Sequence, residues 1–249
     1  MAHTEQWIPY VTDLGEGPAS IMIDMGLVEV APDAARPVLV MASVQFNDPG
    51  ENGLGEEPEI EAIDKVLDGV IDSIKRSCQG IFALTVRTAG RMDAAVYVGT
   101  EQAAAAEQML AMAITPLGGD TLKQDDPDWR LFHELMPEER DIRRAMEMRV
   151  LQQLMNAGDS MEKPRPIEHT LLLPGREAAS QAKKSLERKG FTVVNETNDP
   201  NEELPIRLTI QRVDPATPEH IMELSDQIFE LTTDLDGEYD GWQSPVVRG

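Results

Sequence analysis

Four histidines, the side chain that most hydrolases and many metal enzymes use, are scattered along the chain. They are His3, His133, His169 and His220. No two of them have the spacing of a metal-binding motif. His169 directly follows Glu168, so this carboxylate could orient the imidazole as a general base. The alternative is a half-buried histidine that hydrogen-bonds to the backbone, and we favour it because no nucleophile accompanies His169.

The acidic residues near the C-terminus resemble part of a calcium-binding loop. Asp236, Glu238 and Asp240, followed by Gly241, fit positions one, three, five and six of an EF-hand. Position twelve, where a bidentate glutamate belongs, is Val247. The sequence therefore predicts no metal site here. It predicts a solvated tight turn at Asp240-Gly241 that leads to a packed tryptophan.

Two further signals for chemistry are weak. Gly53-Leu-Gly55 precedes a helix, as phosphate loops do, but the GxxxxGK[ST] pattern is absent and glutamates crowd the helix start. The single cysteine, Cys78, lies four residues after Ile74 on an apolar helix face, which favours a small buried side chain over a catalytic thiol. We expect no catalytic residue, metal or cofactor, and this argues against an enzyme.

Charge restricts the partners of the 249-residue chain. It has 45 acidic and 22 basic residues and a net charge of −23. Nucleic acid and anionic membranes would repel it, whereas a basic protein segment is its natural complement. The first residues lack a secretory-signal pattern, and the single cysteine cannot form an internal disulfide, so we expect a cytoplasmic protein. Whether the chain pairs with itself stays open.

Hydrophobic periodicity predicts the same order of elements twice. After a hairpin at 7–28, strands are expected at 37–46, 81–88, 91–99 and 120–124, with helices at 56–74 and 101–114. The C-terminal third has expected strands at 167–173, 191–195, 205–213 and 238–243, with helices at 176–189 and 218–236. Thr100 and Thr217 are predicted helix caps. Both orders are βαββαβ, typical of a ferredoxin-like antiparallel sheet with its two helices on one face.

The predicted fold class is therefore α+β, with two ferredoxin-like domains joined by a helical connector. Charge and proline positions place the N-terminal α+β domain at 1–125, the connector at 126–165 and the second domain at 166–249. The connector is nearly neutral and contains a predicted helix at 137–157.

Two bacterial families resemble parts of this sequence. The segment Gly158–His169, the pair Gly190-Phe191 and the ending Glu238-Tyr239-Asp240-Gly241-Trp242 resemble the regulator of ribonuclease E activity, protein B. That family has an "EH" strand, a "GF" step after its first helix and a closing "YDGW"; it often has a histidine or an aromatic residue where this chain has Thr170. The N-terminal two thirds resemble the bacterial domain of unknown function 695. The positions that carry this likeness are Trp7, Gly17–Ser20, Asn52–Leu54, Asp126–Trp129 and Leu135–Pro137.

The first resemblance implies a non-catalytic protein that binds and inhibits a ribonuclease E-like endoribonuclease through the Arg-rich region of that enzyme. It also implies a ferredoxin-like core. Five residues are candidates for partner binding: Glu168, His169, Tyr239, Asp240 and Trp242. For these residues we weigh a structural role above a contact role, with Trp242 packed on the sheet and with Glu168 and His169 bracing the turn.

Three functions are compatible with the sequence. We rank an acidic protein-binding regulator first, a ligand-binding or structural module second and an enzyme third. The enzyme would use His169 with Glu168 or Asp240 and would require a concave polar pocket in which these groups converge.

Overall fold

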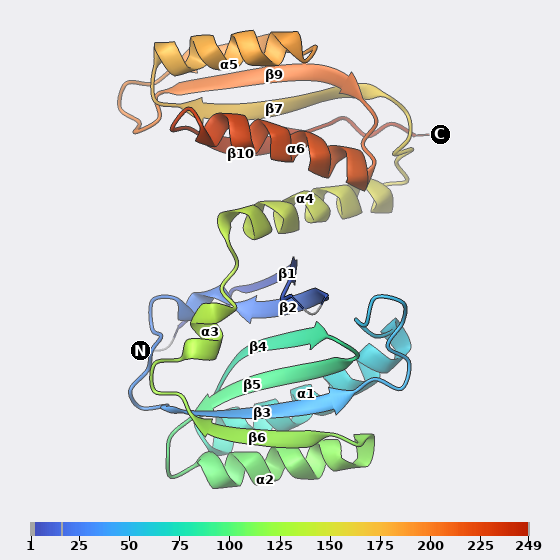
Figure 1. Ribbon diagram of the computed structural model, residues 1–249, viewed down its shortest axis with the longest axis vertical. Coiled ribbons are helices and arrows are strands. Elements are labelled where there is room, and N and C mark those ends of the chain that lie inside the picture. Colours follow the sequence, from blue (N-terminus) through green and yellow to red (C-terminus); the bar gives the residue numbers. More distant parts are fainter. Residues whose placement is uncertain (1–2, 16, 249) are drawn as a thin grey trace. The chain divides into compact units, whose positions relative to one another are not determined.

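A computed structural model describes residues 3–15 and 17–248 of the chain, which form two compact units (Figure 1). Unit 1 is Met1–Ile142 and unit 2 is Arg143–Gly249. Met1, Ala2, Glu16 and Gly249 lie outside the described residues. Part of the predicted N-terminal segment and of the predicted turn at Gly15–Pro18 therefore falls there.

Unit 1 contains a six-stranded antiparallel sheet with the strand order β1-β2-β4-β5-β3-β6. Its strands are β1 (Trp7–Asp13), β2 (Pro18–Asp24), β3 (Val38–Gln45), β4 (Ile81–Thr88), β5 (Arg91–Val98) and β6 (Asp120–Asp125). Its helices are α1 (Glu57–Ser77), α2 (Ala103–Ile114), the short α3 (Arg130–Glu134) and two 3₁₀ turns, Met25–Leu27 and Thr115–Leu117. From β3 to β6 the elements form the βαββαβ unit, and the β1–β2 hairpin extends the sheet beyond β4.

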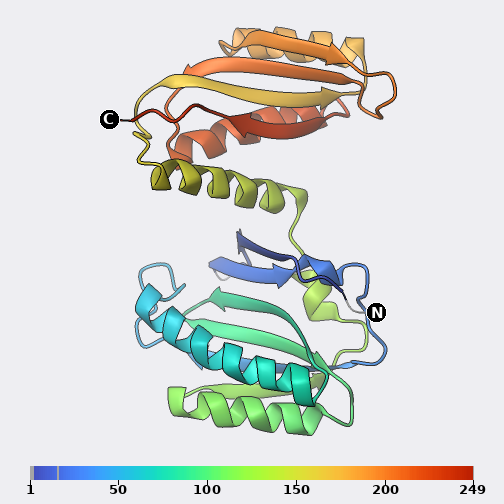
Figure 2. The ribbon, with the colours of Figure 1, turned by 180° about the vertical axis from the view of Figure 1, so that it is seen from behind.

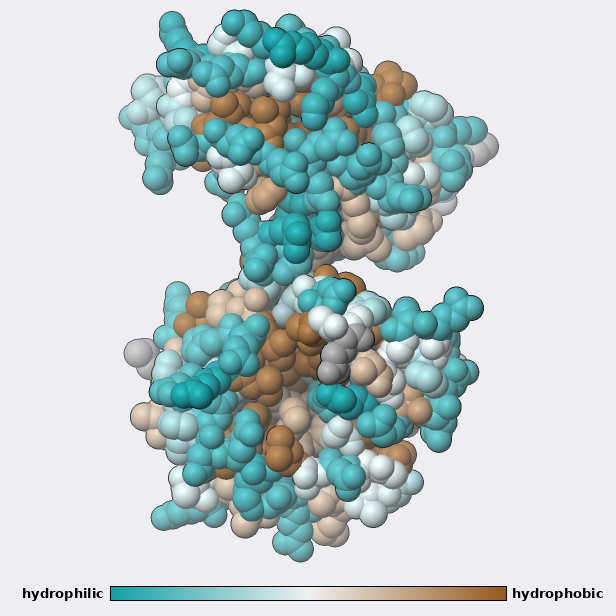
Figure 3. All heavy atoms as spheres, viewed as in Figure 1, coloured by the Kyte–Doolittle hydropathy of each residue, from teal (hydrophilic) through white to brown (hydrophobic). Residues whose placement is uncertain are grey.

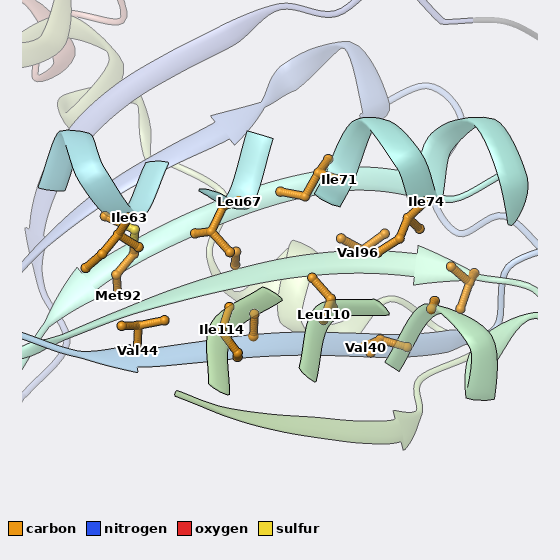
Figure 4. Packing of buried hydrophobic residues seen from close by; sticks show 14 of the residues in the cluster. Val40, Val44, Ile63, Leu67, Ile71, Ile74, Met92, Val96, Leu110 and Ile114 are labelled. Carbon is orange, nitrogen blue, oxygen red and sulfur yellow. The ribbon is translucent and has the colours of Figure 1, made fainter. Parts of the chain in front are cut away.

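The main core of unit 1 lies between one sheet face and the helices α1 and α2, which Figure 4 shows packed over the strands. Helix α1 contributes residues three or four positions apart, among them Ile63, Leu67, Ile71 and Ile74. Strands β3 and β5 contribute every second residue, because alternate side chains of a strand point to one face. Burial of this apolar surface is the main favourable contribution to folding.

The segment after β6 covers part of the other sheet face of unit 1. Trp129 is fully buried, and its indole stacks on the Tyr97 ring at a centroid distance of 3.9 Å. The Asp126 carboxylate accepts hydrogen bonds from the Tyr97 hydroxyl (2.7 Å) and from the Arg130 N–H at the start of α3 (2.8 Å). The Asp126–Trp129 motif thus fixes the chain to the sheet. Figure 3 shows apolar atoms recessed in the middle of this face.

Unit 2 has a four-stranded antiparallel sheet in the order β10-β7-β9-β8, which is the ferredoxin-like order. Its strands are β7 (Arg165–Leu173), β8 (Thr192–Asn198), β9 (Ile206–Asp214) and β10 (Glu238–Gln243). Its helices are α5 (Arg176–Arg188) and α6 (Pro218–Thr233), and α4 (Glu139–Asn156) enters it from unit 1. Figure 2 views this unit from the strand side, with α5 and α6 behind the sheet. We call the side covered by α5 and α6 the helix face and the opposite side the open face.

The predicted fold class is confirmed: the chain is α+β, with two ferredoxin-like antiparallel sheets. The domain boundaries differ from those expected, since the structure divides the expected connector, 126–165, between the two units. Residues 126–135 pack on the sheet of unit 1, whereas Leu151 and Leu154 of α4 pack against Ile167 in unit 2. The apolar contacts of a segment, which its charge balance does not reveal, decide where it belongs.

Several local predictions are wrong or incomplete. Thr100 does not cap α2, because that helix begins at Ala103 and is preceded by Gln102. Thr217 holds the N-cap position of α6, but its side chain makes no capping hydrogen bond. Helix α3 was not predicted, since five residues give too short a window for periodicity. In the described part of the chain, no helix is both long and apolar enough to span a bilayer.

Leu110 should carry much of the packing of α2, because it is fully buried between this helix and the sheet. Replacement by alanine leaves a cavity, and we expect the Leu110→Ala variant to lose about 2–5 kcal/mol of unfolding free energy in urea titrations. Met112, on the same helix, is 72% exposed, so Met112→Ala should change stability by less than about 0.5 kcal/mol. Similar losses in both variants would contradict the described packing of α2.

Candidate functional site

A β-bulge in strand β10 organises the candidate residues of unit 2. Tyr239 pairs with Leu171 and Trp242 pairs with His169, so two residues of β10 lie where β7 has one. Gly241 has a φ angle of +89°, a backbone conformation that residues with a side chain rarely adopt. The Asp240-Gly241 pair was predicted to form a tight turn, which is wrong: it forms this bulge inside a paired strand.

The bulge brings His169 and Tyr239 together in the core. His169 is fully buried, its Nδ1 lies 2.7 Å from the Tyr239 hydroxyl and its ring meets the Phe191 ring edge-on. Its Nε2 has no hydrogen-bond partner within residues 3–15 and 17–248. Burial, which disfavours the charged imidazolium, lowers the pKa of His169 from 6.5 to about 3. The expectation of a half-buried histidine bonded to the backbone is therefore wrong.

Tyr239 is buried in unit 2 as well, and Trp242 is partly buried there. Tyr239 is 8% exposed, and burial raises the pKa of its hydroxyl well above 10. Trp242 packs against a small cluster that includes Ile167 and Ile221, as the sequence predicted. Three of the five candidates, namely these two and His169, are thus held by packing inside the domain.

The remaining candidates, Glu168 and Asp240, lie on the open face. A Glu168 oxygen accepts a hydrogen bond from the Gln243 amide at 2.7 Å, between residues that pair across β7 and β10. Asp240 reaches over β7 to Arg207 on β9, with a 2.6 Å ion pair whose side chains are 41% and 49% exposed. Neither carboxylate forms a hydrogen bond or ion pair with His169, and both leave the sheet on the side opposite to the imidazole. The structure therefore does not assemble the proposed catalytic group.

A groove of about 350 Å³ adjoins Glu168 on this face. Its other walls come from Pro166 on β7 and from Gln243, Ser244 and Pro245 at the end of β10. It offers one carboxylate between two proline rings, a setting that suits a cationic side chain with an apolar stem.

A buried ion pair that sequence reasoning missed fixes the start of β7. Nη1 of Arg165 lies 2.6 and 2.5 Å from the two carboxylate oxygens of Asp159, and both side chains are essentially inaccessible. Asp159 also accepts the Val247 N–H at 2.6 Å, which ties the C-terminal segment to the loop before β7. Loss of hydration alone would raise the pKa of Asp159, but the bonds from Arg165 and Val247 outweigh it and the pKa is lowered.

A second polar cluster, also missed, attaches α4 to α6. The Arg143 guanidinium donates to Glu147 and Ser225 at 2.9 Å each, pairs with Asp226 and lies over the Phe229 ring. Glu147 is nearly inaccessible, and burial raises the pKa of its carboxyl. The charges around α4 nearly balance, so nothing in the sequence indicated this cluster. Its partners on α6 lie about eighty positions away along the chain.

The other chemical signals from the sequence have structural explanations. Cys78 is a free, buried thiol in the core of unit 1. The Gly53–Gly55 loop turns with positive φ at both glycines, and a Cβ on Gly55 would collide with the Phe46 ring. Across the described residues no three or more His, Cys, Asp or Glu side chains gather in an arrangement that could hold a metal ion.

Comparisons with known families match both halves of the chain. The model "Regulator of ribonuclease activity B" (RraB) matches residues 144–244, and the "Family of unknown function (DUF695)" matches residues 5–136. Both resemblances seen in the sequence are therefore confirmed. No curated protein sequence matches the chain significantly.

Solved structures give only distant likenesses. A crystal structure of an unknown protein from Galdieria sulphuraria has 12% identity and a TM-score of 0.25, over 85% of this chain and 99% of that one. A putative glycine cleavage system transcriptional repressor has 11% identity and a TM-score of 0.23, over 85% and 98% of the two chains. Scores this low support no argument about fold or function.

The buried His169 should make stability depend on pH. Its pKa is about 3 in the folded chain and near 6.5 when unfolded, so the unfolded state binds more protons as the pH falls below 6.5. Between about pH 7.5 and about pH 5 the native chain should lose about 2 kcal/mol more unfolding free energy than a His169→Gln variant. Urea titrations at both pH values measure this, and equal losses in the two proteins would show that His169 takes up its proton while folded.

The buried Asp159–Arg165 pair should matter far more than the exposed Asp240–Arg207 pair. Removing the carboxylate charge with Asp159→Asn leaves an uncompensated buried guanidinium, with an expected loss of about 3–5 kcal/mol of unfolding free energy. The matched change Asp240→Asn should cost less than about 1 kcal/mol. Thermal or urea unfolding of both variants tests this, and a reversed order would refute the assigned burial.

Proposed function

Because the chain belongs to the DUF695 family and its residues 144–244 form an RraB domain, we propose that it is a non-catalytic regulator that binds and inhibits a ribonuclease E-like endoribonuclease. The match over 144–244 is the observation that carries this proposal. The partner surface would be an Arg-rich segment of the enzyme, and the complex would form in the cytoplasm.

Charge supports the choice of a basic protein segment. A net charge of −23 attracts cationic polypeptides, speeds their encounter with the chain and competes with RNA for them. On the open face, Glu168, Glu238 and Asp240 come from the adjacent strands β7 and β10, with Arg207 as the nearby cation. An arginine side chain of the partner would enter the groove beside Glu168, where one carboxylate oxygen is already oriented by Gln243.

The positions of the five candidate residues favour a divided role. Glu168 and Asp240 are accessible and would contact the partner, whereas the buried His169 and Tyr239 and the packed Trp242 would hold the strands that present them. The burial of His169 away from both carboxylates also supports a non-catalytic protein over an enzyme.

Calorimetry with the full chain and the Arg-rich scaffold segment of a ribonuclease E-type enzyme tests the proposal. Neutralising two open-face carboxylates with Glu168→Gln and Asp240→Asn should weaken binding by about three- to tenfold, and added salt should weaken it further. Glu230→Gln on α6 is the control, because this exposed glutamate lies on a helix away from the open face, and its affinity should be unchanged.

In parallel, the native chain should slow RNA cleavage by that enzyme. Lack of binding at low salt would overturn the proposed partner. Binding that the double variant and the Glu230→Gln control weaken equally would overturn the assignment to the open face.

A further inference from the structure

A second groove in unit 2, between α5 and β8, is lined by more cations than carboxylates. Its volume is about 550 Å³. Three cations from one stripe of α5 line it, Arg176, Lys183 and Lys184, together with two carboxylates, Glu187 of α5 and Glu196 of strand β8. Lys183 pairs with Glu196, while no ion pair involves Arg176 or Lys184 among the residues that the structure describes. These two cations without an ion pair are eight positions apart on α5, about 12 Å along its axis.

Strand β8, which borders this groove, is an exposed edge. It is the last strand of the sheet, and all seven of its residues are exposed. Val193 and Val194 are 38% and 44% exposed. The free N–H and C=O groups of an edge strand can pair with another strand, and inward charges and bulges such as those of β8 limit this pairing without removing it. The one charged residue of β8, Glu196, turns toward α5 and pairs with Lys183.

A bulge between Val193 and Asn195 is the one feature of β8 that disturbs its pairing with β9. Beyond it, Asn195 to Asn198 follow β9 in regular antiparallel register. This stretch keeps the extended geometry that an added strand requires. It also lies directly beside the cation-lined groove, since Glu196 and Asn198 belong to both.

We propose that the outer edge of β8 binds an extended acidic peptide segment of a partner protein as an additional strand. The main-chain groups of β8 supply the hydrogen bonds, and alternate carboxylates of the peptide enter the groove and meet Arg176 and Lys184. The apolar residues between them point to the opposite face of the sheet. This site is independent of the proposed function, because it uses another edge of the unit and takes a partner of opposite charge.

Two other occupants fit the same features less well. In antiparallel two-fold pairing of β8 with β8 of a second copy, the two α5 helices would lie side by side, so that their cations repel. An RNA strand would find no aromatic platform among the groove residues. A peptide strand uses both the backbone edge and the cations.

The test uses the full chain and a capped heptapeptide of alternating valine and glutamate, labelled for fluorescence anisotropy. The peptide should bind and slow the hydrogen exchange of β8 amides. Reversing the free cations with Arg176→Glu and Lys184→Glu should weaken binding by at least about fivefold. Arg188→Glu makes the same charge change as each single reversal, on the same helix but outside the groove, and its affinity should stay within about twofold of the native chain.

Several results would overturn the proposal. One is no binding at millimolar peptide; another is an equal loss in the Arg188→Glu variant, which would mean a diffuse charge effect. Tight binding of a peptide of alternating valine and lysine would show that the groove cations do not select an acidic peptide. Oligouridylate that binds with the same variant dependence, while the peptide does not, would assign the groove to RNA. A concentration-dependent dimer that excludes the peptide would assign the edge to a second copy.

Discussion

The bulge at Asp240-Gly241 is the constraint on which the open face of unit 2 depends. Residues three apart in a regular strand point to opposite faces, yet Tyr239 and Trp242 both face the helices. The extra residue restores this register, and the left-handed conformation of Gly241 makes it possible without strain. As a result His169 meets Tyr239 in the core, while Asp240 is turned to the open face and reaches Arg207.

This division separates the parts of one sequence motif into those that hold the fold and those that can meet a partner. The buried Arg165–Asp159 pair fixes the beginning of β7, and the His169–Tyr239 contact fixes its middle against β10. Together they hold Glu168 on a strand that is paired on both sides, so the proposed binding would cost little ordering of this side chain's backbone. The cations Arg176, Lys183 and Lys184 lie elsewhere, along α5. Unit 2 therefore has two surfaces that differ in charge.

The repeated βαββαβ order could be predicted because amphipathic periods and turn residues are local signals, as the Ala89-Gly90 hairpin illustrates. The bulge could not, although a glycine inside a strand is a recognised sign of one. The stacking of Trp129 on Tyr97 and the pairing of Arg143 with Asp226 join residues that are far apart in the sequence, so local patterns do not predict them. The boundary between the two units depends on such contacts as well. The candidate residues were identified by family likeness. Which of them lie on the helix face and which on the open face follows only from the strand register.

The central claim is that a basic segment of a ribonuclease binds the open face of unit 2. Backbone NMR spectra of the full chain, recorded during titration with the Arg-rich segment, measure this most directly. The account predicts shift changes concentrated on β7, β9 and β10 around Glu168 and Asp240, with little change along α5. Changes centred on unit 1 or on α5, or none at all, would contradict it.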